Sequence, residues 1–238
     1  MSETTAGNGV CGVLLAGGLA RRMGGGDKCL RLLAGQPILA HVISRVRTQV
    51  DALVINANGD PSRFDEFALP VVADVIEGFA GPLAGVLSGM VWARTHAPNC
   101  SHVVTVPTDA PFLPDDLVQR FRSALAEQGA ELACAASGGR THPVFGLWPV
   151  GLEEDLRQAM EQDDIRKVDV WTARYRLAQV DWPSEPADPF FNANRPEDLA
   201  QAETMITAAA PEAYCHRRIS HGKRPRWNAA LQNAAKPP

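Results

Sequence analysis

Apolar residues form two kinds of pattern along the chain, and the two patterns alternate. Short continuous runs such as "VLL" at 13–15 and "HVVTV" at 102–106 lie between glycine, proline and polar residues, as buried strands do. Longer stretches place apolar residues three and four positions apart, as at Ile38, Val42 and Val46, which is the spacing of one helix face. The alternation predicts repeated strand–helix–strand units.

These units predict the fold class. The strands are expected within residues 11–18, 51–60, 69–74, 101–106, 130–136, 142–149 and 175–182, and the helices within 36–50, 81–95, 114–129, 151–160 and 194–206. Strands that alternate with helices form a mostly parallel sheet whose crossover helices cover both faces. We therefore expect a single-domain, three-layer α/β/α fold of the Rossmann-like type.

The pattern changes near residue 206. No linker composition interrupts residues 1–206, which predicts one domain. Residues 211–238 hold six Lys or Arg and one Glu, and no clear apolar period follows Ile219. We expect residues 207–238 to form a basic, flexible C-terminal tail.

Composition narrows the class of protein. The net charge of −4 over 238 residues gives no general case for binding nucleic acid or a membrane surface. The apolar runs are too short to span a bilayer, and the N-terminus lacks the features of a secretory signal. The five cysteines are widely spaced without a C-x-x-C pair, which argues against a disulfide framework and a zinc site. We expect a cytoplasmic protein.

A long basic loop follows the first expected strand. Residues 14–35 contain six glycines, three arginines and one lysine. Glycines let backbone N–H groups approach an anion, and Arg21, Arg22 and Lys28 can supply positive charge for a triphosphate. The loop is not a Walker A motif, because Cys29 follows Lys28, and it lacks G-x-G-x-x-G. The residues alone leave two interpretations open, a phosphate-binding loop and a glycine-rich surface loop with solvated arginines.

A carboxylate follows the strand at 103–106. Asp109 lies between Pro107 and Pro111, which restrict the backbone on both sides. Ligands of open α/β sheets bind outside the carboxyl ends of the strands, and Mg²⁺ takes one or two protein carboxylates together with phosphate oxygens and water. Asp109 is therefore a candidate Mg²⁺ ligand, with a turn aspartate or a helix cap as the simpler alternative.

Several motifs together resemble one family. "LLAGGLARRMGGGDKCL" resembles the signature L-A-G-G-x-x-x-R-M-G-x-x-D-K of nucleotidyltransferases similar to the molybdenum cofactor guanylyltransferases. "PTDAPFLP" resembles the metal-binding strand end of that family. "VINAN", "VVADVIEGFAGPLAG", "HPVFGLW" and "FFNANRPEDL" match further family segments in the same order, over about residues 10–206. The resemblance implies the Rossmann-like nucleotidyltransferase fold.

The resemblance also implies roles for individual residues. It implies three catalytic residues, Arg22, Lys28 and Asp109, and makes Asp109 the ligand of Mg²⁺. It places Asn192 and Asn194 on the pterin side. The residues that it implies for nucleotide binding are Leu15, Ala16, Gly17, Lys28, Asn56, Asp74 and Asp109.

The implied reaction is the transfer of GMP from GTP to the terminal phosphate of molybdenum-molybdopterin. The products are the molybdopterin guanine dinucleotide cofactor and pyrophosphate. GTP and molybdenum-molybdopterin are the implied partners, and cofactor biosynthesis proteins and target apoenzymes are further candidates.

Two alternatives remain open. The chain could be a cytidylyl- or sugar-nucleotidyltransferase, although those enzymes commonly have A-A-G where this chain has Ala16, Gly17 and Gly18. It could also be a non-enzymatic molybdenum cofactor carrier, which the presence of both Lys28 and Asp109 disfavours.

Three further residues carry open interpretations. His142 precedes a strand beside the expected site and is either a ligand contact or a turn histidine. Cys29 is either a reactive thiol beside Lys28 or a small apolar filler. Asn194, with Glu197 three residues later, is typical of a helix capping box.

Overall fold

The computed structural model describes residues 7–17, 27–78 and 81–208. Two expectations lie outside these ranges: the part of the glycine-rich loop that includes Gly18 and the expected catalytic Arg22, and residues 209–238 of the expected tail. Within the described ranges, no helix has both the length and the apolar character needed to cross a membrane.

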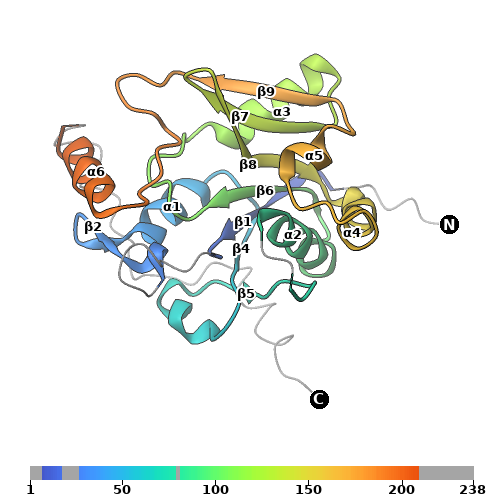
Figure 1. Ribbon diagram of the computed structural model, residues 1–238, viewed down its shortest axis with the longest axis horizontal. Coiled ribbons are helices and arrows are strands. Elements are labelled where there is room, and N and C mark those ends of the chain that lie inside the picture. The colour runs from blue at the N-terminus through green and yellow to red at the C-terminus, as the bar shows by residue number, and fades with distance from the viewer. Residues whose placement is uncertain (1–6, 18–26, 79–80, 209–238) are drawn as a thin grey trace.

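A seven-stranded sheet forms the centre of the molecule, in the order β5-β4-β1-β6-β8-β7-β9 (Figure 1). All neighbouring strands are parallel except where β8 pairs antiparallel with β6 and β7. The mostly parallel sheet is therefore confirmed. The strands are β1 (Gly9–Leu15), β4 (Ala52–Asn56), β5 (Val71–Val72), β6 (Cys100–Pro107), β7 (Leu132–Ser137), β8 (Arg140–Pro149) and β9 (Leu177–Trp182).

A tight turn reverses the chain between β7 and β8. Its two residues, Gly138 and Gly139, have φ angles of 53° and 74°. Two consecutive positive φ angles match the twist of a β-hairpin, and glycine adopts them without steric cost. As a result β8 begins at the edge of the sheet where β7 ends, and Ser137 and His142 become neighbours.

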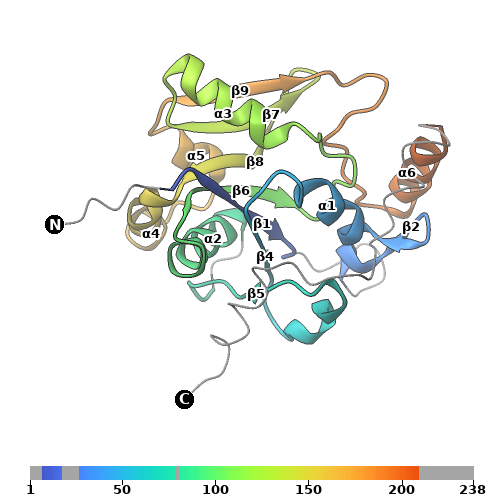
Figure 2. The same ribbon diagram turned by 180° about the vertical axis from the view of Figure 1, so that it is seen from behind.

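Helices cover both faces of the sheet. α1 (Ile38–Val46) and α3 (Leu117–Gln128) pack on one face, while α2 (Pro82–His96), α4 (Glu153–Glu161) and α5 (Val168–Thr172) pack on the other. The second group lies nearer the viewer in Figure 1 and the first group in Figure 2. The predicted three-layer α/β/α arrangement is confirmed.

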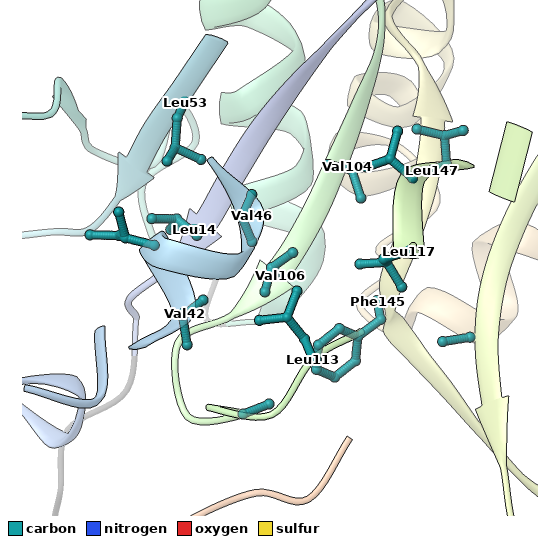
Figure 3. Packing of buried hydrophobic residues seen from close by; sticks show 14 of the residues in the cluster. Leu14, Val42, Val46, Leu53, Val104, Val106, Leu113, Leu117, Phe145 and Leu147 are labelled. Atoms are coloured by element: carbon teal, nitrogen blue, oxygen red, sulfur yellow. The ribbon is translucent and has the colours of Figure 1, made fainter. Parts of the chain in front are cut away.

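Alternate residues of each strand enter the two cores. In β1, Val10 and Leu14 face α1 and α3, whereas Cys11 and Val13 face α2. Figure 3 shows Leu14 packed with apolar side chains of α1 and of the neighbouring strands. Burying one such aliphatic side chain stabilises the fold by about 1.5–3 kcal/mol, so the expected strand–helix pattern builds both layers.

Helix α2 approaches the sheet closely through two glycines. A Cβ atom on Gly89 would lie 2.4 Å from Val13 Cγ2, and one on Gly85 would lie 2.5 Å from Asn56 Oδ1. A side chain at either position would push α2 away from β1 and β4. The glycines therefore leave room for Asn56 at the end of β4.

Short elements depart from the sequence-based expectation. The expected helix at 36–50 is shorter, because Gln36 and Pro37 form β3 and pair with β2 (Leu32–Leu33). Periodicity does not detect elements of so few residues. The 3₁₀ helices and α5 are also too short for periodicity to detect, and the sequence analysis did not predict them. The 3₁₀ helices are η2 (Lys28–Leu30), η3 (Pro61–Phe67) and η4 (Val150–Leu152).

The last described helix, α6 (Pro196–Ala208), lies beside the β2–β3 hairpin (Figure 1). Its N-terminus is capped by Asp198, whose Oδ2 accepts hydrogen bonds from the backbone N–H groups of Asn194 and Arg195, both at 2.7 Å. The expected pairing of Asn194 with Glu197 is therefore replaced by Asp198. The side chain of Asn194 has a different partner, described below.

Candidate active site

Three parallel strands end side by side at one edge of the sheet. In the strand register, Leu15 of β1 pairs with Asn56 of β4 and with Pro107 of β6. The chain that leaves β1 is held on both sides: Ala16 N–H donates to the Asn56 carbonyl at 2.9 Å, and Thr108 Oγ donates to the Leu15 carbonyl at 3.1 Å. The backbone expected to hold the nucleotide therefore starts from a fixed position.

Gly17 continues from this point into open space. It is exposed, and a Cβ atom placed on it would meet no heavy atom of the described residues within 4 Å. The backbone at Gly17 is therefore accessible to a ligand, as the expected nucleotide contact requires.

Lys28, Asp109 and Asn194 meet beside this edge and form what we call the Lys28 cluster. Lys28 Nζ donates to Asp109 Oδ2 at 2.6 Å and also to Asn194 Oδ1. The Lys28 side chain is 16% exposed and that of Asp109 is 24% exposed. Ala193 N–H donates to the Asp109 backbone carbonyl at 2.9 Å. Three residues expected at the site are thus in direct contact.

One carboxylate oxygen of Asp109 lacks a hydrogen-bond partner among the described residues. This oxygen, Oδ1, is buried. A carboxylate oxygen accepts hydrogen bonds or binds cations, and a buried acceptor without a partner is costly. Among the described residues, Asp109 Oδ1 is therefore an available ligand atom, distinct from the Oδ2 that accepts from Lys28.

The residues present fit a Mg²⁺ ion that is completed by a substrate. Within the described residues, no group of three or more His, Cys, Asp or Glu side chains could hold a metal, so a closed all-protein metal centre is excluded there. Mg²⁺ does not need one, because it binds through one or two carboxylates together with phosphate oxygens and water. Asp109 Oδ1 is the oxygen available for this role.

A second group, the Asp74 cluster, consists of Asn56, Asn58 and Asp74. Asn56 Nδ2 donates to Asp74 Oδ1 at 3.0 Å, and Asn58 Nδ2 donates to Asp74 Oδ2 at 2.8 Å. Asp74 N–H donates in return to Asn58 Oδ1 at 2.8 Å. Asn56 is buried, so the hydrogen bond from Asn56 holds the Asp74 carboxylate on its buried side. Asn56 and Asp74 were expected at the site. Asn58 ends the "VINAN" segment of the sequence analysis but was given no role of its own.

Arg63 of η3 links the Asp74 cluster to Asp27, the residue directly before Lys28. Its Nε lies 2.8 Å from Asp27 Oδ2, and its second terminal nitrogen donates to the Asn58 carbonyl at 2.6 Å. Sequence analysis missed Arg63, because Asp27 and Arg63 are far apart in the chain and belong to no common motif.

Cys29 has a packing role. Its side chain is buried, and burial, together with the nearby Asp27 carboxylate, raises the pKa of the Cys29 thiol to about 11. Burial and the raised pKa both favour the apolar-filler interpretation of Cys29.

Comparison with known proteins identifies the family. The family model described as a MobA-like NTP transferase domain matches residues 12–176. A Bradyrhizobium sp. (strain ORS 278) protein named molybdenum cofactor guanylyltransferase is 58% identical over 204 residues, which cover 86% of this chain and 95% of the relative.

Solved structures show the same fold. Molybdopterin-guanine dinucleotide biosynthesis protein A from Archaeoglobus fulgidus matches with a TM-score of 0.65 at 20% identity, over 83% of this chain and 99% of that one. A Mycobacterium tuberculosis H37Rv protein in complex with manganese matches with a TM-score of 0.60 at 16% identity, over 83% and 99% of the two chains. From the family model and the high identity of its relatives, the chain belongs to the molybdenum cofactor guanylyltransferases of the MobA-like nucleotidyltransferase family.

Proposed function

We propose that this chain transfers GMP from GTP to the terminal phosphate of molybdenum-molybdopterin and releases pyrophosphate. One observation carries the proposal at the level of the site. Lys28 and Asp109 are paired at the end of β6, next to the backbone of Leu15 and Ala16, and Asp109 keeps a buried oxygen without a partner. This is an arrangement for positioning phosphates and a divalent cation.

The reaction needs positioning and charge more than a nucleophile from the protein. An oxygen of the acceptor's phosphate monoester forms a bond to the α-phosphorus of GTP. The bond from that phosphorus to the oxygen bridging to the β-phosphorus breaks, and its electron pair leaves with pyrophosphate. The attacking group is already an anion, so a covalent enzyme intermediate is unnecessary. The main obstacle is repulsion between two anions.

Positive charge at the Lys28 cluster reduces the repulsion between the two anionic substrates. Lys28 binds the triphosphate, and the predicted Arg22 adds a second positive charge. Asp109 would hold Mg²⁺, whose positive charge would offset this repulsion and the negative charge that develops on pyrophosphate. The manganese complex of the M. tuberculosis relative supports a divalent cation in proteins of this fold.

The remaining residues expected at the site have roles in binding the nucleotide and the acceptor. The backbones of Leu15, Ala16 and Gly17 hold the nucleotide, and the Asp74 cluster forms the wall beside its nucleoside, with Asn56 in contact with Asp74. Asn192 and Asn194 lie toward the acceptor. Asn194 contacts Lys28, and Asn192 is exposed next to it.

We keep three broader expectations as part of the proposal. Residues 1–206 form the nucleotidyltransferase domain and residues 207–238 the basic tail. A chain that ends near Ala210, just after α6, should fold and turn over like the full chain. Cofactor biosynthesis proteins and target apoenzymes are further partners. The protein acts in a reducing cytoplasm, which the four free cysteines among the described residues support.

A product assay tests the proposal. The full chain is incubated with molybdenum-molybdopterin, GTP and Mg²⁺, and pyrophosphate and the mass of the pterin product are measured. We expect equal amounts of pyrophosphate and guanine dinucleotide, and no release of pyrophosphate without the pterin or after chelation of Mg²⁺. Release of pyrophosphate without a dinucleotide product contradicts the proposal, and so does the absence of turnover.

A further inference from the structure

Three polar side chains outside both clusters meet near the same edge of the sheet. Ser137 ends β7, His142 lies in β8, and Asp188 follows β9. Ser137 Oγ lies 2.7 Å from His142 Nε2 and donates to Asp188 Oδ1 at 2.9 Å. We call these residues the Ser137 trio. Ser137 is completely buried, so its hydroxyl depends on these two partners.

The single proton of the Ser137 hydroxyl fixes the direction of both hydrogen bonds. Asp188 Oδ1 already accepts from Phe190 N–H at 2.9 Å, and a carboxylate donates none. Ser137 therefore donates to Asp188 and accepts from His142, so the proton of the imidazole lies on Nε2. The two hydrogen bonds of Ser137 thus determine the tautomer of His142.

The charge of His142 follows from its surroundings. Burial lowers the pKa of His142 from 6.5, with an opposing effect of the Asp188 carboxylate and a further lowering by Arg140. At neutral pH the ring is therefore uncharged, and it acts through its Nε2–H group and its aromatic face.

The aromatic face of His142 contacts the same segment that Asp188 belongs to. The ring centroids of His142 and Phe190 are 4.8 Å apart. Phe190 is buried and also packs against Phe145 at 4.8 Å and Trp182 at 5.4 Å. Asp188 and Phe190 are thus both anchored beside His142, one by hydrogen bonds and one by packing.

The other end of this segment is anchored in the Lys28 cluster. Residues 188–194, which we call the Asn192 arm, link the end of β9 to α6. Ala193 N–H donates to the Asp109 carbonyl at 2.9 Å, and Asn194 Oδ1 accepts from Lys28. Asn192 is exposed between the two anchors. The Ser137 trio therefore holds the N-terminal end of the Asn192 arm in place.

We propose that His142 is a positioning residue: through Ser137 and Asp188 it fixes the Asn192 arm, and so sets the affinity for the phosphate-bearing acceptor substrate. This inference rests on the proposed function, which places Asn192 and Asn194 toward the acceptor. A loop with one anchor removed samples open conformations, and ordering it again on binding weakens affinity. The nucleotide contacts at β1 and β4 do not pass through the arm and are expected to stay unchanged.

Hydrogen exchange tests the positioning role without any substrate. The amides of Phe190 and Ala193 are followed in the full chain, in His142→Leu, Ser137→Ala and His142→Gln. We expect the first two variants to lose protection at both amides by about tenfold, the effect of losing one buried hydrogen bond. Gln retains an N–H donor at a reach similar to that of Nε2, so His142→Gln should keep most of the protection.

A second histidine provides the matched control. His96 is exposed, stacks on Trp92 at 5.2 Å and contacts neither the trio nor the arm. His96→Leu should leave exchange at Phe190 and Ala193 unchanged. Unaltered protection in both His142→Leu and Ser137→Ala would overturn the positioning role, and so would a loss in His142→Gln equal to that in His142→Leu.

Kinetics then separate the acceptor from the nucleotide. In His142→Leu and Ser137→Ala we expect the KM for molybdenum-molybdopterin to rise about tenfold, consistent with the weakened arm. The KM for GTP should rise much less, because only Lys28 and Asp109 among the proposed nucleotide contacts touch the arm. An equal rise in both KM values contradicts the inference. If the wild-type chain does not turn over molybdenum-molybdopterin, the proposed function fails, and the exchange measurement still decides the role of His142.

Discussion

The Lys28 cluster and the Asp74 cluster lie at the same edge of the sheet, yet they are built differently. In the Lys28 cluster, the hydrogen bonds join residues 81 and 166 positions apart, and a buried oxygen of Asp109 has no partner among the described residues. In the Asp74 cluster, the contacts join residues 16 and 18 positions apart, and both carboxylate oxygens of Asp74 accept a hydrogen bond from an amide group.

This difference separates two kinds of task. A charged group with an available ligand position can bind a cation and exchange partners when phosphates arrive, which is the requirement for lowering the barrier of a reaction. A local network with its hydrogen bonds satisfied keeps a fixed shape, which is the requirement for recognising a ligand. We therefore expect changes in the Lys28 cluster to lower kcat and changes around the Asp74 cluster to raise KM for the nucleotide.

The largest effect is expected for Asp109→Asn. An amide removes the negative charge that holds Mg²⁺, so kcat should fall on the order of 10²–10³-fold, the loss of several kcal/mol of charge stabilisation. Steady-state kinetics over a range of Mg²⁺ concentrations measure it. Asp181→Asn, a change of an exposed aspartate in β9, is the control and should behave as wild type. Near-normal turnover of Asp109→Asn at ordinary Mg²⁺ concentrations would refute the role of Asp109.

A smaller loss is expected for Lys28→Ala. Removing one charge-assisted contact to phosphate costs about 1.5–3 kcal/mol, so kcat/KM for GTP should fall by about 10- to 100-fold. Arg47→Ala, at an exposed position after α1, serves as the control for loss of one positive charge. An unchanged kcat/KM in Lys28→Ala would show that its contact with Asp109 is only structural.

The smallest of these mutational effects is expected for Arg63→Met, because Arg63 acts through Asp27 and Asn58 and touches no substrate in our account. We expect the KM for GTP to rise about three- to tenfold, the loss of roughly 1 kcal/mol of positioning, with little change in kcat. A double-mutant cycle with Asp27→Asn should show non-additive effects. Arg176→Met, which loses only an exposed ion pair, is the control. Additive effects of Arg63→Met and Asp27→Asn would break the proposed link between Asp27 and the Asp74 cluster.

The strand ends were predictable because parallel strands bring distant residues to one edge. Periodicity placed the strands before Gly17 and Asp109, and the family resemblance added Lys28, Asn56, Asp74 and Asn194. The structure brings Lys28, Asp109 and Asn194 into contact, and their roles in binding and catalysis stay predictions. The catalytic role of Arg22 stays a prediction, since Arg22 lies outside the described residues.

Contacts between short elements were not predictable in this way. Arg63 of η3 lies 2.8 Å from Asp27, the residue that directly precedes η2, and no periodic pattern encodes that contact. The cap of α6 was assigned to the wrong acidic residue, since Asp198 and Glu197 are adjacent and both suit a first helical turn. By contrast, the Gly138–Gly139 pair between two strand-like runs was a usable hairpin signal. It would have predicted the antiparallel β8 and brought His142 next to Ser137.

Nucleotide choice tests the central claim most directly. Guanine offers N1–H and N2–H₂ donors and an O6 acceptor, and cytosine reverses part of this pattern. A site that matches guanine leaves its own polar groups unpaired with cytosine, which allows strong discrimination. The measurement is a competition in which the full chain receives molybdenum-molybdopterin and equal concentrations of GTP and CTP, and the two dinucleotide products are separated and quantified. The account predicts that the guanine dinucleotide strongly predominates. Equal or greater formation of the cytosine dinucleotide would contradict it.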